Sequence, residues 1–295
     1  MLTNSLQALI ALTALAVTAS GAAAAGGDKE IPRFTSFGGA CPKCELSGRK
    51  MTGAHFIGAD FSGTALVGSD LRDARFLRSN FTGADLSRAD LTNAEMLAAT
   101  FTNATLSHAR LRSIEARGAV FAVTNLSRAD LSDASLTGAN FSRAILTDAG
   151  LRSAEMRAAN LSQVEARGAD FRDTTLSAAV LTGGHFDRAS FRSADLTLAV
   201  LTGASFDGAD FRDAELEHTV IAGVDLSRAR GLTQDQIDEA CGDARTRLPG
   251  GLTPRTCGLS ARARSPGARP EGAASGLQRR SQPDTELFQL LVADP

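Results

Sequence analysis

Residues 84–111 read ADLSRADLTNAEMLAATFTNATLSHARL, and a large apolar residue occupies every fifth position of this stretch. The same spacing runs unbroken from Leu46 to Leu226, where 35 of 37 positions are Leu, Phe, Met or Ile. A small residue, usually Ala, lies two places before most of them. A period of five matches neither an α-helix, with 3.6 residues per turn, nor a flat strand with a repeat of two.

The period does fit a short extended segment in which residues i−2 and i point the same way and a corner follows. Chained segments of this kind turn the backbone through a polygon, and stacked polygons form an all-β solenoid. Phenylalanines recur in every fourth pentapeptide, which predicts four pentapeptides per coil and aromatic side chains stacked between coils. The three series are Phe61, Phe81, Phe101, Phe121 and Phe141; Phe171, Phe191 and Phe211; and Phe186 and Phe206.

Two exceptions to the period support an inward position for both apolar residues of each pentapeptide. At Ala116 and Ala166 the large residue is small, and the residue two places earlier is enlarged to Ile114 and Val164. This exchange conserves volume, as a close-packed interior requires.

Strings such as Ala84-Asp85-Leu86-Ser87-Arg88 and Ala129-Asp130-Leu131-Ser132-Asp133 resemble the pentapeptide-repeat family. The resemblance covers residues 44–230. It implies a right-handed quadrilateral parallel β-helix, here of about nine coils. It implies no catalytic residues, because the family's motif is structural.

The N-terminal segment indicates export. The first 27 residues contain no ionisable side chain, and an apolar run from Leu6 to Val17 precedes a small-residue stretch with an Ala-x-Ala site near Ala25. We therefore expect residues 1–25 to be a signal peptide and the protein to be periplasmic or secreted. A membrane anchor is the alternative, but the run is shorter than the roughly 20 residues that a spanning helix needs. Residues 26–43 are expected to be a linker.

Beyond Leu226 the period ends, and residues 231–257 are expected to cap the solenoid. Thr233 and Gln236 form the pattern of a capping box, which predicts a helix from Gln234 to Ala240 or Cys241. In an exported protein a disulfide between Cys241 and Cys257 is expected to close the following loop, the alternative being two free thiols. Residues 258–295 are rich in Pro, Gly, Ser and Arg and are expected to be a disordered tail.

The sequence Cys41-Pro42-Lys43-Cys44 is a weaker signal. A Cys-x-x-Cys pair is compatible with a redox motif, half a zinc site or a local disulfide. A zinc site needs two further ligands, and only His55 is near in sequence. We favour a structural thiol or a short disulfide.

Composition argues against several classes of function. The chain has no Trp and no Tyr, its four His are scattered, and its net charge is −2. We therefore expect no cofactor, no small-molecule substrate and no nucleic-acid partner. Some members of the resembled family mimic DNA and bind type II topoisomerases. A mimic about 43 Å long would carry roughly 25 negative charges, whereas residues 44–230 have 23 acidic and 20 basic side chains.

Two outward columns remain as candidate surfaces. An acidic one comprises Glu95, Glu115, Glu155, Asp195 and Glu215, and its alternative interpretation is an ordinary solvated face. The other is a candidate interface made by Val180, Val200 and Val220, beside Gly183, Gly203 and Gly223; its alternative is tolerated surface valine.

The sequence thus predicts a non-catalytic exported solenoid that acts as a rigid protein-interaction or structural module. Its partner is an unknown protein or a second copy in a homodimer. The alternatives are a DNA mimic that binds a type II topoisomerase and a secreted effector that docks on host proteins.

Overall fold

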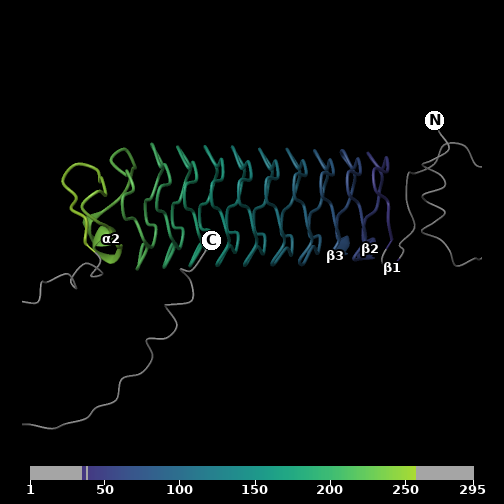
Figure 1. Cartoon of the computed structure of the whole chain (residues 1–295), viewed down its shortest axis with the longest axis horizontal. Coiled ribbons are helices and arrows are strands. Elements are labelled where there is room, and N and C mark those ends of the chain that lie inside the picture. The colour runs from purple at the N-terminus through teal and green to yellow at the C-terminus, as the bar shows by residue number, and fades with distance from the viewer. Residues whose placement is uncertain (1–34, 38, 257–295) are drawn as a thin grey trace, which may run out of the picture. The chain divides into compact units, whose positions relative to one another are not determined.

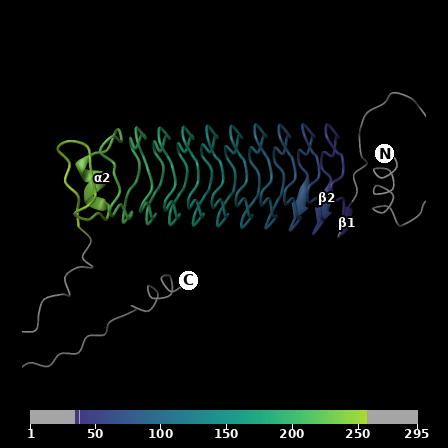
Figure 2. The same cartoon turned by 45° about the horizontal axis from the view of Figure 1, so that its top comes forward.

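The computed structural model describes residues 35–37 and 39–256, which form one stack of coils (Figure 1). Three short strands, β1 (Thr35–Phe37), β2 (His55–Ile57) and β3 (Arg75–Leu77), pair in parallel in the order β1-β2-β3. Isolated parallel bridges continue this pattern through the stack, and those up to Arg230 join equivalent residues of successive coils, 20 residues apart, as Thr100 with Val120. Figure 2 shows β1 and β2 at one end and α2 (Gln234–Glu239) at the other. Within the described residues no helix has the length and apolarity to cross a membrane.

The corners of the coils explain the five-residue period. After the inward Phe101 the backbone turns, and the amide of Ala104 donates to the Phe101 carbonyl at 2.9 Å. The third residue of this turn, Asn103, has a φ of 57°. Left-handed backbone of this kind recurs at the equivalent residue of every corner from Lys43 to Gly223 and favours Gly or Asn, as at Gly138 with a φ of 66°. One extended segment and one such turn consume five residues.

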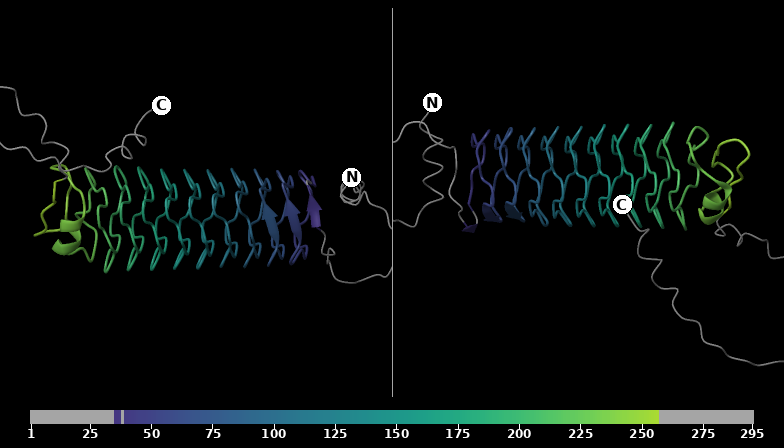
Figure 3. Two further views of the ribbon diagram at one scale, coloured as in Figure 1. Left: turned by 90° about the horizontal axis from the view of Figure 1, so that it is seen from below. Right: turned by 180° about the vertical axis from the view of Figure 1, so that it is seen from behind.

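Adjacent coils are joined by backbone hydrogen bonds. The amide of Leu106, for example, donates to the carbonyl of Asn125 at 2.7 Å, and Asn125 donates back to Ala104 at 3.0 Å. Figure 3 shows the resulting stack from two further sides. Because each bond joins neighbouring coils, the solenoid has contacts that are long-range in sequence but local along its axis.

The interior is filled by the two apolar residues of each pentapeptide. Large inward residues from Leu71 to Leu201 are completely or almost completely buried, and so are the alanines two places before them. The exchanges at Ile114 with Ala116 and Val164 with Ala166 are confirmed, since all four side chains are buried. The core is therefore one continuous apolar spine, as the period predicted.

The predicted phenylalanine stacks are confirmed. Phe101 lies between Phe81 and Phe121, with ring centroids at 4.9 and 5.0 Å and rings 1° and 7° from parallel. Phe191 lies in the same way between Phe171 and Phe211, at 5.0 and 5.1 Å. The remaining predicted neighbours also stack, at 5.1, 4.9 and 5.3 Å: Phe61 with Phe81, Phe121 with Phe141, and Phe186 with Phe206.

Four buried threonines add hydrogen bonds between coils that were not predicted from the sequence. Each replaces the small inward alanine, and its hydroxyl donates to the carbonyl of an inward residue in the preceding coil. The distances lie between 2.6 and 2.8 Å: Thr64 to Cys41, Thr124 to Phe101, Thr174 to Leu151 and Thr219 to Leu196. A Thr in an alanine position of the repeat was the available signal, because a buried hydroxyl needs a partner.

The expected linker 26–43 is wrong at its C-terminal end. Strand β1 pairs with β2, Ala40 bridges Asp60, and Cys41 lies buried in the core. The first coil therefore begins before residue 44. The expected boundary was too late because it rested on Leu46 and the unbroken apolar period that follows it.

The predicted helix and capping box are present at the C-terminal end. Helix α2 ends at Glu239, and the Thr233 side chain accepts from the amide of Gln236 while the Gln236 side chain accepts from the amide of Thr233. The coil then resumes, because Cys241 bridges Val220 and Arg247 bridges Asp225. The predicted signal peptide (1–25), Cys257 and the tail (258–295) lie outside the described residues.

Candidate functional site

The outer surface is divided into four faces, each a column of residues that precede the large inward residues. We number the faces by one residue of each column: Glu45, Lys50, His55 and Asp60 mark the first, second, third and fourth faces. Each column continues in every fourth pentapeptide, so each face presents parallel rows of outward side chains. Because the inward side chains are buried, the side chains that can contact a partner or a ligand are those of the faces and corners.

On the second face, charges cancel within single pentapeptides. Asp70 binds Arg72 with both carboxylate oxygens, at 2.8 Å to Nε and 2.7 Å to a terminal nitrogen. The same paired arrangement joins Asp170 to Arg172 and Asp210 to Arg212. The aspartate also accepts from the amide of its arginine, so it closes the corner as well.

These contacts lower the pKa values of the aspartates. The hydrogen bond from the Arg72 side chain is the main reason why the pKa of Asp70 falls to about 2. The pKa values of Asp170 and Asp210 are lowered by Arg172 and Arg212 for the same reason. The aspartates stay ionised and paired at neutral pH, so these pairs offer no proton donor or acceptor poised for catalysis.

The acidic column predicted from sequence lies together on the third face. Parallel bridges place Glu95 beside Glu115 and Asp195 beside Glu215, while Ser135 and Thr175 interrupt the series. Arginines neutralise part of it: Arg75 binds Glu95 at 2.9 Å, and Arg117 lies 3.1 Å from Glu115. The column is therefore a broken stripe of partly paired carboxylates.

The candidate interface residues lie side by side on the fourth face. Val180 bridges Val200, which bridges Val220. Val180 is 38% exposed, and the other two are partly exposed. Each corner that follows them carries a glycine, Gly183, Gly203 or Gly223, in left-handed conformation. The strip is thus apolar and bordered by residues without side chains.

Elsewhere on this face the same position closes the corner with a polar side chain. The Asn140 and Asn160 amide oxygens accept from the backbone amides of Ser142 and Ser162 at 2.9 Å each. A valine supplies no such acceptor. The valine positions therefore lack the side-chain hydrogen bond to the corner and expose apolar surface instead, which is typical of a surface used for contact.

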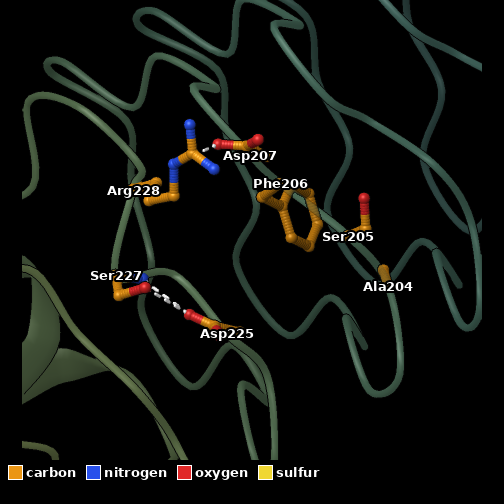
Figure 4. A pocket seen from close by; sticks show the side chains of 7 residues that line it. All are labelled: Ala204, Ser205, Phe206, Asp207, Asp225, Ser227 and Arg228. Atoms are coloured by element: carbon orange, nitrogen blue, oxygen red, sulfur yellow. Dashed lines mark hydrogen bonds and ion pairs between the residues drawn. The ribbon is translucent and has the colours of Figure 1, made fainter.

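A shallow pocket lies near the C-terminal end of the first face (Figure 4). Its polar side chains are already engaged, since Ser227 donates to Asp225 at 2.6 Å and Arg228 binds Asp207 at 3.0 Å. The buried Phe206 forms the remaining wall. Among the described residues, those that line this pocket include no histidine beside Ser227.

Cys41 and Cys44 form a disulfide, which was one of the alternatives for this pair. Cys241 is also disulfide-bonded. Its predicted partner Cys257 lies outside the described residues, so that pairing stays a prediction. In the part of the chain that the structure describes, no group of His, Cys, Asp and Glu side chains could hold a metal ion.

Bridges that recur from coil to coil and a filled apolar core define this protein as a parallel β-solenoid. The model of the family described as "Pentapeptide repeats" matches it in eight copies, over residues 43–77, 79–114 and, in overlapping segments, 124–230. The chain belongs to the pentapeptide repeat family, whose members fold as right-handed β-helices.

Several solved structures are similar to this chain. HetL, a pentapeptide repeat protein involved in heterocyst differentiation regulation from the cyanobacterium Nostoc, is 28% identical; the match covers 74% of this chain and 88% of HetL, with a TM-score of 0.36. QnrB1, a plasmid-mediated fluoroquinolone resistance protein, is 26% identical over 57% of this chain and 86% of QnrB1, with a TM-score of 0.41. No curated protein sequence matches the chain.

Proposed function

We propose that this protein is a non-catalytic, exported solenoid that acts as a rigid module for protein interaction or structure. The observation that carries the proposal is the apolar strip of Val180, Val200 and Val220. On the other faces many charged side chains are paired with one another, as Asp170 with Arg172 and Asp210 with Arg212. Because the interior of the rod is filled with apolar side chains, we expect a partner protein to bind its flat outer faces.

In this proposal the rod is a closed, four-sided β-helix of about nine coils, and helix α2 covers its C-terminal end. The supporting contacts come from Gln236, whose side-chain nitrogen donates to the carbonyls of Phe211 and Ala214 at 3.0 and 2.7 Å. Phe211 and Ala214 are the buried residues on either side of the corner between the second and third faces. A covered end prevents coil-to-coil addition of further chains.

Export is supported by two independent features. Residues 1–25 have the pattern of a signal peptide, and Cys41 and Cys44 are joined as a disulfide, a bond typical of oxidising compartments. Fractionation of cells that produce the tagged chain tests this. We expect the protein in the periplasm or medium, and a variant lacking residues 2–25 in the cytoplasm. A full-length chain retained in the cytoplasm would contradict export.

The alternative of a DNA mimic that binds a type II topoisomerase rests on the acidic column of the third face. Its carboxylates are too few and too often paired with arginine, as Glu95 with Arg75, to match the charge density of a duplex. We expect the purified chain to leave DNA supercoiling by a bacterial topoisomerase unchanged. Inhibition that disappears in the variant E95Q/E115Q would favour the mimic instead.

A secreted effector that docks on host proteins would use the same faces. Affinity capture with the wild-type chain and with V200K separates these functions. A partner from the periplasm that V200K fails to capture supports the proposed module, whereas one found only in host extracts supports the effector.

A further inference from the structure

Charge is distributed very unevenly among the four faces. Each pentapeptide presents three outward residues, one before and two after its large inward residue, so nine coils give 27 outward positions per face. On the fourth face and the corner after it, only Asp60 and Arg143 are charged in the nine coils from Asp60 to Gly223, and the coil of Ala40 before them adds Lys43. The equivalent positions of the first, second and third faces carry 10, 17 and 10 charged residues. One face of four is therefore almost neutral along its whole length.

The exposed large apolar side chains gather around the same face. The described residues include five of them, and four lie on the fourth face or its two corners. Val180 belongs to the face, Ile57 and Leu198 to the corner before it, and Val123 to the corner after it. Leu198 is 55% exposed and lies two residues from Val200. A neutral surface with its own apolar groups indicates an interface rather than a solvated side.

We propose that the fourth face binds the fourth face of a second copy of this chain, with the two rods parallel and in register. This inference rests on the proposed function as an interaction module and names its partner. Two copies that meet at this face bury only the few charges of Lys43, Asp60 and Arg143, whereas any of the other three faces would bury many more charges, and burying unpaired charge costs heavily. Its 27 outward positions also match the 20–30 residues per side of a stable interface.

The direction of the rods follows from the few charges on and beside the face. Antiparallel rods centred on the coil of Asn140 would place Arg143 against the second copy's Arg143, and Arg117 against its Arg157. Parallel rods related by a twofold axis along their length instead bring the corner before the face against the corner after it. Arg143 then faces Thr137 and Gly138, so the arginine contacts disappear.

In the parallel arrangement each residue of the fourth-face column meets its own copy. Val180 and Val200 pair with themselves, and Asn140 and Asn160 meet as amides, which can both donate and accept. Asp60 is the remaining like-charge contact, in the second coil. Its carboxylate already accepts from the amide of Ser62 and from the Asn80 side chain, at 3.0 Å each.

Sedimentation equilibrium of the full exported chain over a concentration series tests this assignment. We expect a dimer whose dissociation constant rises on the order of a hundredfold in V200K, because two lysines are then buried face to face. I145K is the matched control: Ile145 occupies the same position in its pentapeptide on the first face and is 41% exposed, against 38% for Val180. We expect I145K to dimerise like the wild type, and equal thermal unfolding of both variants excludes misfolding.

Mixing V200K with V200E tests the register. In parallel rods the two residues meet, so the mixture is expected to recover a one-to-one dimer that neither variant forms alone. A monomeric wild type, a dimer that V200K leaves intact, or a mixture without recovery would each overturn the proposal. A monomer that still captures a periplasmic partner would overturn it while leaving the proposed function standing; a monomer retained in the cytoplasm would contradict both.

Discussion

The stacked phenylalanines allow the contribution of one aromatic pair to be measured inside a single column. Phe101 has a stacked ring on each side, at 4.9 and 5.0 Å, whereas Phe141 has one, Phe121 at 4.9 Å. On its other side the column continues with the aliphatic Leu161. Both phenylalanines are fully buried. Replacing either with leucine therefore removes the same apolar volume but a different number of aromatic neighbours.

We expect F101L to cost about 0.5–1.5 kcal/mol more free energy of unfolding than F141L, the value of one aromatic pair beyond its buried area. The transfer and cavity contributions are matched and cancel in the comparison. For a chain of this size the extra cost lowers Tm by roughly 2–4 °C per kcal/mol.

Urea unfolding followed by circular dichroism measures both variants, and an unchanged m-value shows that the same structure unfolds. The double variant F81L/F101L serves as the control, because it removes a pair whose members are in contact and must show a non-additive cost. Equal costs for F101L and F141L would refute the reasoning, since the rings would then act as filling volume alone.

Three further outcomes follow from individual contacts. The pKa of Asp70 is lowered to about 2 in the folded protein, against about 4 in the unfolded chain. The stabilisation that Asp70 adds to the fold is therefore present above about pH 4 and is lost as pH falls toward 2. We expect D70N to flatten this part of a plot of urea midpoint against pH. G138A should destabilise by about 1 kcal/mol in thermal melts, since Gly138 has a φ of 66° with no atom near an added Cβ. T124V should cost about 0.5–1.5 kcal/mol in urea unfolding, because the Phe101 carbonyl loses one of its two hydrogen bonds; a neutral T124V would contradict this.

Much of the interior was predictable because it depends on local geometry. Alternation within one short segment decides that Phe101 and Ala99 point inward, and volume conservation predicts the exchange at Ile114 and Ala116. Stacking of Phe101 on Phe121 then follows from a coil of four pentapeptides. The capping box of Thr233 and Gln236 was predictable for the same reason, since both residues lie within one turn of helix.

The ends were harder to predict. The first coil starts earlier than expected because β1 is defined by its pairing with β2, not by an apolar period. After helix α2 the coil resumes at Cys241 and Arg247, although the spacing to Val220 and Asp225 is no longer that of four pentapeptides. A periodic sequence pattern does not predict such pairings, because the inserted residues change the spacing along the chain while the same residues of neighbouring coils still pair.

For the candidate interface, the sequence alone placed Val180, Val200 and Val220 in one column. The sequence did not reveal how far the charged side chains of the other three faces neutralise one another. That depends on side-chain conformers such as those that join Asp210 to Arg212, or Arg75 to Glu95 in the next coil. The neutral fourth face becomes significant only beside these paired surfaces.

The linear chain thus determined the coil, its contents and the order of its faces, because a repeat of five with apolar residues at fixed places admits one way to bury them. Tertiary structure alone decided where the stack begins and resumes, which hydroxyls bond to a neighbouring coil, and which charges cancel. These outcomes depend on groups from successive coils meeting at hydrogen-bond distance, and that meeting is fixed only when the coils are stacked.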